Sequence, residues 1–171
     1  MPLEPDQALV MLQMTLPMLE REQQTTVKVM SAVPADKADY KPDANSMSAF
    51  ELSWHIAASE DRFLSGVAAG AFDFTVQERA KAMPEVISWY QDSFAKNLAA
   101  IKGMSGEQLA KVIDFRGVFQ MPAISYLTFC SNHSIHHRGQ LSVYLRPMGA
   151  KVPAIYGESF DSKAGRMAAQ G

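Results

Sequence analysis

Apolar residues recur at helical spacing over four long segments of this chain, which otherwise shows little sign of β-structure. The segments cover about Gln7–Ala32, Ser48–Val67, Pro84–Ile101 and Pro122–Tyr144. An amphipathic helix has to bury its apolar face, and four such helices can bury their faces against one another. No repeat or linker divides the chain, so the pattern predicts one all-α domain over residues 1–171, built as a four-helix bundle.

Pro17 interrupts the first segment, and two interpretations follow from it. One long helix could bend at this residue. Alternatively, a short N-terminal piece precedes a main helix that has Pro17 in its first turn. The second interpretation is favoured, because Glu20 and Glu22 then lie near the positive end of the helix dipole.

Short capping signals mark the ends of the other helices. Ser48 and Glu51 match a capping box at the start of the second helix. Gly103 stands where a residue in the left-handed conformation is expected to end the third helix. Ser105 and Gln108 offer a second capping box, which would start a short turn of helix.

Three stretches lie outside the predicted long helices. Residues 72–82 are expected to form a crossover between the second and third helices. Residues 111–120 are rich in β-formers, and Arg116-Gly117 could turn a small hairpin there. Residues 151–171 are expected to be largely irregular, with a frayed tail over 161–171.

Charge, hydropathy and cysteine content predict the cellular location and argue against a nucleic-acid or membrane partner. The net charge is −2 and no Lys/Arg cluster occurs, so nucleic acid is not expected as the principal partner. No apolar run approaches the length that spans a bilayer, and the acidic N-terminus lacks the basic start and apolar core of a secretory signal. The single cysteine, Cys130, allows no internal disulfide, which predicts a cytoplasmic protein.

Three of the four histidines lie within Asn132–Gln140, in the fourth predicted helix. His133 and His137 are four residues apart, so they lie on one helix face and could bind one metal ion. His55 lies on the apolar stripe of the second helix and is expected to face inward. Three neutral nitrogens from two helices would leave a coordination position open, as in catalytic sites. Each histidine could instead be a hydrogen-bonded core residue or a surface residue.

Two further residues, His136 and Cys130, are alternative candidates for metal ligands. His136 is three residues from His133 and lies about 60° from it on a helical wheel, against about 40° for His137. That small preference does not exclude a pairing of His133 with His136. Cys130 lies one turn before His133 and could approach the metal as a thiolate, although a small buried apolar group is its commoner role.

Four other polar residues are weak candidates for catalysis or orientation. Glu51 and Glu60 flank His55 and could act as a base or as an acceptor beside the metal. The capping box already explains Glu51, and Glu60 is expected to be a solvated charge. Arg138 and Gln140 could orient ligands or a substrate carboxylate, but an ordinary exposed arginine fits the sequence equally well.

The residues around the histidines carry a family resemblance. The matching parts are Trp54-His55, the string at His133–Gln140, the exit at Leu145–Gly149 and the segment Pro153–Gly157. By these residues the chain resembles the DinB/YfiT-like metalloprotein superfamily from about Tyr40 to Gly157. The string His-x-x-x-His-Arg-Gly-Gln is its most specific part.

The resemblance implies a fold, a ligand set and an assembly. It implies a bundle with a long crossover between the second and third helices, commonly found as a homodimer. His55, His133 and His137 correspond to the three metal ligands, and His136 is then a neighbour outside the ligand set. Characterised relatives include S-transferases and isomerases that use low-molecular-weight thiols.

The expected function follows from this site. Three imidazoles suit zinc, nickel, iron or manganese, and we expect zinc or nickel. A bound metal would lower the pKa of a water or a thiol, which predicts a metal-dependent thiol S-transferase or hydrolase acting on a small molecule. The alternatives are a metal-binding stress-response protein without turnover and a helical interaction module in which the histidines only pack.

Overall fold

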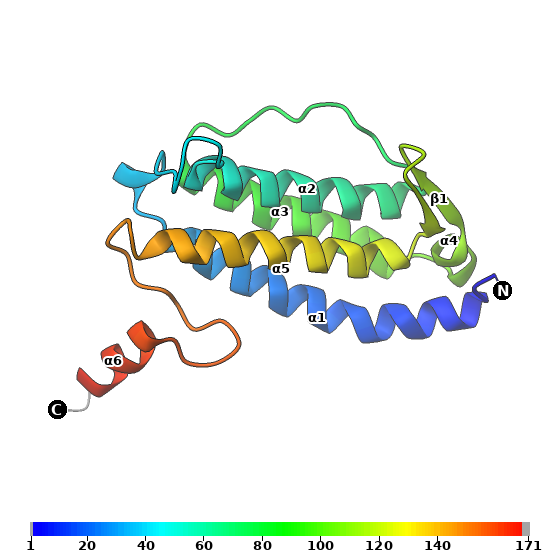
Figure 1. Ribbon diagram of the computed structural model, residues 1–171. Coiled ribbons are helices and arrows are strands. Elements are labelled where there is room, and N and C mark those ends of the chain that lie inside the picture. Colours follow the sequence, from blue (N-terminus) through cyan, green and yellow to red (C-terminus); the bar gives the residue numbers. More distant parts are fainter. Residues whose placement is uncertain (1, 169–171) are drawn as a thin grey trace.

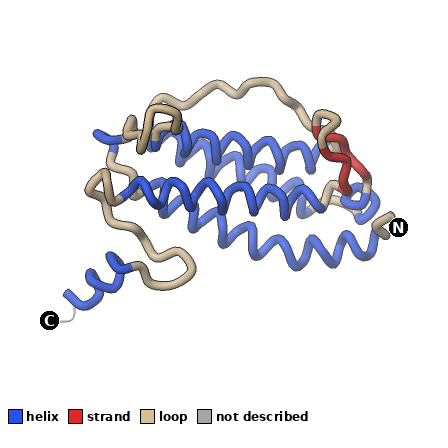
Figure 2. Tube along the Cα trace, in the orientation of Figure 1, coloured by secondary structure: helices blue, strands red, loops and turns tan. Residues whose placement is uncertain are grey.

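The computed structural model describes residues 2–168, which are mostly helical (Figure 2). The four long helices are α1 (Pro5–Ser31), α2 (Ala49–Ala69), α3 (Met83–Lys102) and α5 (Ser125–Leu145). The shorter elements are a 3-10 helix (Ala35–Lys37), α4 (Gly106–Ala110), β1 (Val112–Phe115), β2 (Phe119–Pro122) and α6 (Phe160–Ala168). No helix in the described range is both long enough and apolar enough to cross a bilayer.

The four long helices form the predicted bundle (Figure 1). α2 packs against α3 and α5, and α1 packs against the same two helices, so α1 and α2 lie diagonally opposite. α1 and α5 run in one direction, while α2 and α3 run in the other (Figure 1). The α2–α3 pair is parallel because residues 70–82 return along the length of the bundle, which confirms the long crossover.

The interior consists of two apolar clusters with a polar layer between them. The cluster near the hairpin includes Leu12, Leu19, Leu64, Leu98 and Leu127. The cluster at the other end includes Val29, Leu52, Ile56, Val86 and Leu141. Each of α1, α2 and α5 contributes buried polar residues between the two clusters, and this polar layer contains Thr26, Glu60, Ser134 and Arg138.

α1 is one continuous helix, so the favoured division at Pro17 is wrong. Its N-terminus instead has a capping box formed by Glu4 and Gln7. A proline inside a helix costs about 3 kcal/mol. The buried side chains of Leu12 and Leu19, on either side of the proline, contribute roughly 3–6 kcal/mol together and offset that cost.

Two predicted helix ends also differ from the structure. Gly103 has a φ of −89° and is not a left-handed cap, whereas Gly70 after α2 has a φ of 69°. Pro122 ends β2 and does not open the fourth helix. The hairpin alignment continues past it, because the Ala123 N–H donates to the Lys111 carbonyl at 2.9 Å, and α5 begins only afterwards.

The hairpin and the Ser48 and Ser105 capping boxes are confirmed. Arg116 and Gly117 have φ values of 57° and 69°, as a two-residue turn with two left-handed positions requires. The strands pair antiparallel from Val112 opposite Pro122 to Phe115 opposite Phe119. This hairpin closes one end of the bundle (Figure 1).

The C-terminal region was predicted to be largely irregular, but it contains a helix. α6 covers most of the stretch expected to be frayed, and residues 169–171 lie outside the described chain. Its first turn is capped reciprocally: the Ser162 N–H donates to Ser159 Oγ at 3.0 Å, and the Ser159 N–H donates to Ser162 Oγ at 2.9 Å. None of its residues is buried, and it stands apart from the four long helices (Figure 1).

Candidate metal centre

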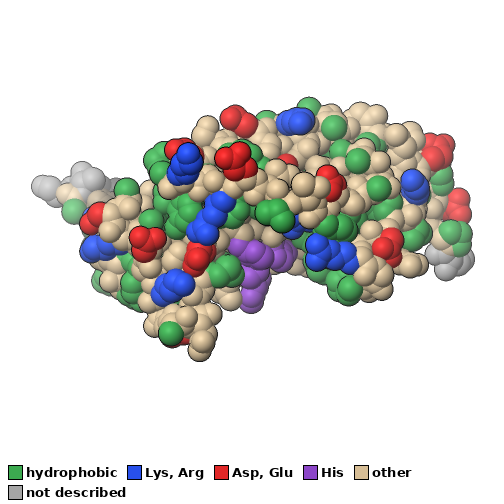
Figure 3. Space-filling model, turned by 90° about the horizontal axis from the view of Figure 1, so that it is seen from above, with side chains coloured by type: hydrophobic (Ala, Val, Ile, Leu, Met, Phe, Trp, Pro, Cys, Tyr) green, Lys and Arg blue, Asp and Glu red, His purple; other side chains and the backbone are tan. Residues whose placement is uncertain are grey.

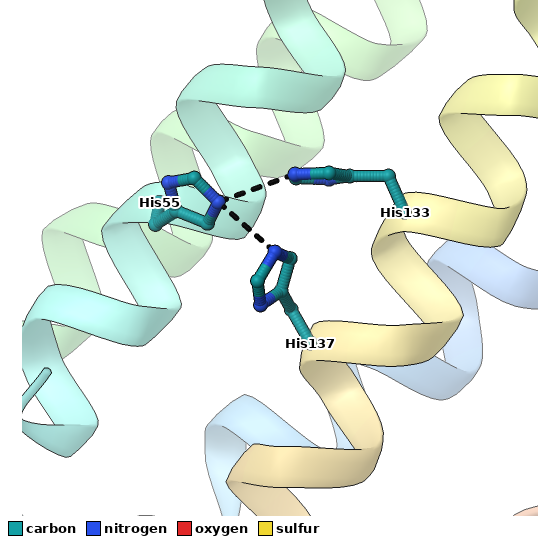
Figure 4. Close-up of side chains that lie close together, drawn as sticks. All are labelled: His55, His133 and His137. Atoms are coloured by element: carbon teal, nitrogen blue, oxygen red, sulfur yellow. Dashed lines mark hydrogen bonds between the residues drawn. The ribbon is translucent and has the colours of Figure 1, made fainter. Parts of the chain in front are cut away.

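Three imidazole rings converge between α2 and α5 (Figure 4). α2 supplies His55, and α5 supplies His133 and His137 from successive turns of one face. The Nε2 atom of His55 lies 3.2 Å from the Nε2 atom of His133 and 3.2 Å from that of His137. All three nitrogens lie within 4.8 Å of one another, so the structure brings together the three residues that the resemblance implied.

The spacing of these nitrogens fits a shared cation. Tetrahedral zinc with bonds of 2.0–2.1 Å separates its ligand nitrogens by about 3.3 Å. The two measured separations of 3.2 Å are close to that value. Ring protons alone cannot pair all three nitrogens, because one N–H on His55 Nε2 can serve only one of its two neighbours. A cation at the centre would satisfy three lone pairs at once, so the group could hold a metal ion.

Burial keeps two of the rings in the form that binds metal. It lowers the pKa of His55, and the nearby charges of His137 and Arg62 add to the effect. Burial, followed by the charges of the neighbouring histidines, lowers the pKa of His133 to about 4. Both rings are therefore neutral at pH 7, and a neutral imidazole offers a lone pair to a metal without first losing a proton.

Gln140 orients the third ring. Its Oε1 atom lies 2.7 Å from His137 Nδ1, and because an amide oxygen only accepts, the ring nitrogen donates. With the proton held on Nδ1, the lone pair of His137 is on Nε2, the atom that faces His55. Gln140, a weak candidate from sequence, thus contacts a ring of the histidine group directly.

His136 and Cys130 lie outside the group. The His136 side chain is exposed, with its ring centroid 4.8 Å from that of His137, so the alternative pairing with His133 is not formed. Cys130 is fully buried in the apolar cluster near the hairpin. Burial raises the pKa of its thiol well above the ordinary value, so it is a neutral buried group.

Glu51 has a structural role away from the histidines. It accepts the Ser48 N–H at 2.8 Å as part of the capping box. It also pairs with Lys41 at 3.4 Å and with Arg79 at 3.9 Å. The hydrogen bond from the Ser48 backbone is the main cause of its lowered pKa, and the structure does not place its carboxylate in the histidine group.

Arg138 is buried and not exposed. Only 1% of its surface is accessible. Its Nη1 atom lies 2.7 Å from Glu22 Oε2 and also donates to the Glu22 carbonyl at 3.1 Å, while its Nη2 atom donates to the Tyr156 hydroxyl. Tyr156 in turn donates to Glu22 at 2.8 Å. The partners lie 18 and more than a hundred residues away in sequence, so no local pattern could identify them.

Glu60 was expected to be a solvated charge, and the structure contradicts this. Its accessible fraction is 4%, and its carboxylate accepts hydrogen bonds from Tyr90 at 2.8 Å and from Ser134 at 2.5 Å. Burial raises its pKa to about 7, against the opposing effect of these two hydrogen bonds and of Arg138. Its position four residues after Ile56 on the apolar stripe was the available signal.

Comparison with known proteins places the chain in a family. The DinB family profile matches residues 10–168. The protein YjoA of Bacillus subtilis is 30% identical over 129 residues, which is 72% of this chain and 82% of YjoA. The crystal structure of YjoA has a TM-score of 0.71 at 26% identity, covering 85% of this chain and 99% of that one.

Two other solved structures share the fold. A DinB-like protein from Bacillus cereus has a TM-score of 0.72 at 22% identity and covers 83% of this chain and 95% of its own. A mycothiol-dependent maleylpyruvate isomerase has a TM-score of 0.60 at 12% identity, with coverage of 76% and 60%. Likeness at these identities shows the fold alone. The profile match and the YjoA similarity extend over most of the sequence, and the chain belongs to the DinB family.

Proposed function

We propose that this chain binds one divalent transition-metal ion through His55, His133 and His137, and uses it in a reaction of a small molecule. The convergence of three ring nitrogens from two helices is the observation that supports the proposal. Zinc or nickel is the proposed ion, with iron and manganese as alternatives, because all four accept imidazole ligands. The reaction is S-transfer from a low-molecular-weight thiol or hydrolysis.

A divalent ion held by three imidazoles would make a coordinated hydroxide or thiolate available near neutral pH. The residues of this chain prepare that site. Burial keeps His55 and His133 unprotonated, and Gln140 holds the proton of His137 on the far ring nitrogen. The rings are half-buried, and Figure 3 shows histidine at the molecular surface with hydrophobic side chains beside it. A small molecule can therefore approach from solvent.

Two arguments support a low-molecular-weight thiol as a substrate. The isomerase with the same fold is named as mycothiol-dependent, and that property is transferred here only as a proposal. A thiol is also acidic enough to lose its proton when it binds a metal, without a base from the protein. No Asp, Glu or Cys belongs to the histidine group in the described residues, so a substrate that ionises on the metal suits this site better than one that needs a carboxylate base.

The second candidate is a metal-binding stress-response protein without turnover. The same observation favours it, because a group of three histidines without a neighbouring carboxylate can hold an ion and supply no general base. Under either candidate we place the protein in the cytoplasm, where its single buried cysteine stays reduced.

A thiol assay separates these two candidates. We expect metal-loaded protein to accelerate the reaction of a low-molecular-weight thiol, such as glutathione, with an electrophilic aryl halide, and metal-free protein not to. In the cobalt(II) form, the bound thiolate is expected to add a sulfur-to-metal charge-transfer band. Metal-loaded protein that gives neither result with a panel of cellular thiols, and that hydrolyses no ester or amide in a parallel panel, would favour binding without turnover.

A homodimer is part of the same proposal. One face of α1 exposes an apolar stripe of Val10, Met14 and Met18, with accessible fractions of 55%, 70% and 59%. Residues four apart on a helix form a continuous strip, and an exposed strip of this kind favours association. We expect sedimentation velocity at micromolar concentration to give a dimer, and Met14→Lys to shift it towards monomer. A monomer in the unsubstituted protein would contradict the prediction.

A further inference from the structure

The polar layer includes one carboxylate that joins three helices. Glu60 on α2 accepts from the Tyr90 hydroxyl on α3 at 2.8 Å, through Oε1. It accepts from the Ser134 hydroxyl on α5 at 2.5 Å, through Oε2. All three side chains are buried. Neither Glu60 nor either of its two partners belongs to the histidine group.

The two hydrogen bonds of Glu60 differ in which helices they join. Ser134 directly follows His133, and Glu60 lies five residues after His55. The Ser134–Glu60 bond therefore joins the two helices that supply the histidine group, at positions close in sequence to His133 and His55. The Tyr90–Glu60 bond joins α2 to α3, which supplies no histidine to the group.

We infer that the Ser134–Glu60 hydrogen bond is a positioning contact, which fixes α2 against α5 and so holds the imidazole of His55 at the separation from His133 and His137 that a shared metal ion requires. The inference rests on the proposed metal site. Ser134 and Glu60 act through the helices and do not touch the ion.

Apolar packing alone would hold this register less tightly. Contacts between aliphatic side chains have no preferred direction, whereas a hydrogen bond weakens steeply with distance and angle. A buried hydrogen bond to a carboxylate is also among the stronger ones, and a buried partner left without it is destabilising. The bond at 2.5 Å lies in the polar layer between the two apolar clusters.

Ser134→Ala and Tyr90→Phe form a matched pair for testing this inference. Each removes one hydroxyl donor from the same carboxylate, and each leaves Glu60 with its other donor. Only Ser134→Ala removes the hydrogen bond between α2 and α5, the helices that carry the three histidines. We expect Ser134→Ala to raise the Kd for zinc about tenfold, at the lower end of the effect of removing contacts that orient metal ligands, and Tyr90→Phe to change it by less than about twofold.

The visible absorption spectrum of the cobalt(II)-substituted protein is a second measurement, which does not depend on stability or activity. This spectrum reports coordination geometry, so we expect a changed spectrum for Ser134→Ala and an unchanged one for Tyr90→Phe. Ser134→Thr keeps the hydroxyl and should restore both the affinity and the spectrum.

The inference is overturned if Ser134→Ala and Tyr90→Phe have the same effect on zinc affinity. If Ser134→Ala binds zinc as the unsubstituted protein does, or if Tyr90→Phe weakens binding as much, the bond has no special role at the site. Unsubstituted protein that binds no metal would instead overturn the proposed function, and this inference with it. The two failures are therefore distinguished by the unsubstituted protein alone.

Discussion

The double substitution His133→Ala, His137→Ala is expected to abolish specific metal binding. It removes both nitrogens that α5 places near His55, and a single imidazole does not retain a divalent ion through dialysis. Because loss of contacts that only orient ligands already costs 10–100-fold, we expect removal of two ligands to raise the Kd by at least about a thousandfold. Competition with a chelating dye measures the change.

His136→Ala is the matched control for this loss. His136 lies beside His137 on the same helix, but its side chain is exposed and belongs to no metal-binding group in the described chain. Its removal should leave the Kd within about twofold of the unsubstituted value, since a surface histidine outside the ligand set contributes little. Metal retained by the double variant, or lost from His136→Ala, would contradict the assignment.

Arg138→Ala is expected to destabilise the protein by about 3–5 kcal/mol, as happens when one partner is removed from a buried ion pair. The guanidinium fills a buried site between α5, α1 and the C-terminal segment, with Glu22 and Tyr156 as its partners. Its loss leaves the Glu22 carboxylate with the Tyr156 hydroxyl but without a positive charge. Equilibrium unfolding in urea, followed by far-UV circular dichroism, measures the effect.

Arg146→Ala provides the comparison. Arg146 also pairs with a carboxylate, Asp161, at 3.2 Å, but its side chain is largely exposed. A solvent-exposed pair contributes at most about 1 kcal/mol, so this variant should unfold almost as the unsubstituted protein does. Equal losses for the two arginines would show that burial of Arg138 does not determine its contribution.

Patterns along single helices predicted the four-helix fold and the pairing of His133 with His137 on one face. Apolar spacing identified the four long helices, and the turn signal at Arg116-Gly117 identified the hairpin. The spacing of His133 and His137 placed their rings on one face, and the family resemblance added His55 to them. The helix positions, the hairpin turn and the shared face of His133 and His137 depend on neighbours within a few residues, so a single sequence displays them. The place of His55 beside them came from the resemblance.

Two of the errors, at Pro17 and Glu60, concern residues whose environment is formed by other helices. Pro17 remains inside α1 because leucines on both sides of it are buried by the rest of the bundle. Glu60 was expected to be a solvated charge, and for Arg138 an exposed position fitted the sequence as well as an orienting one. Their partners lie on α3, α5, α1 and the C-terminal segment, so the neighbouring sequence did not show that both are buried. Charged residues are rarely buried without such partners, and a single sequence does not show where the partners are.

Metal analysis combined with X-ray absorption spectroscopy, on protein reconstituted with zinc and dialysed, shows whether the three imidazoles bind one ion. We expect one zinc ion per chain, with three imidazole nitrogens at about 2.0–2.1 Å. Less than about a tenth of an equivalent of zinc, measured under conditions where imidazoles are unprotonated, would contradict this expectation. A spectrum without a three-imidazole shell would contradict it as well, even if the metal were bound.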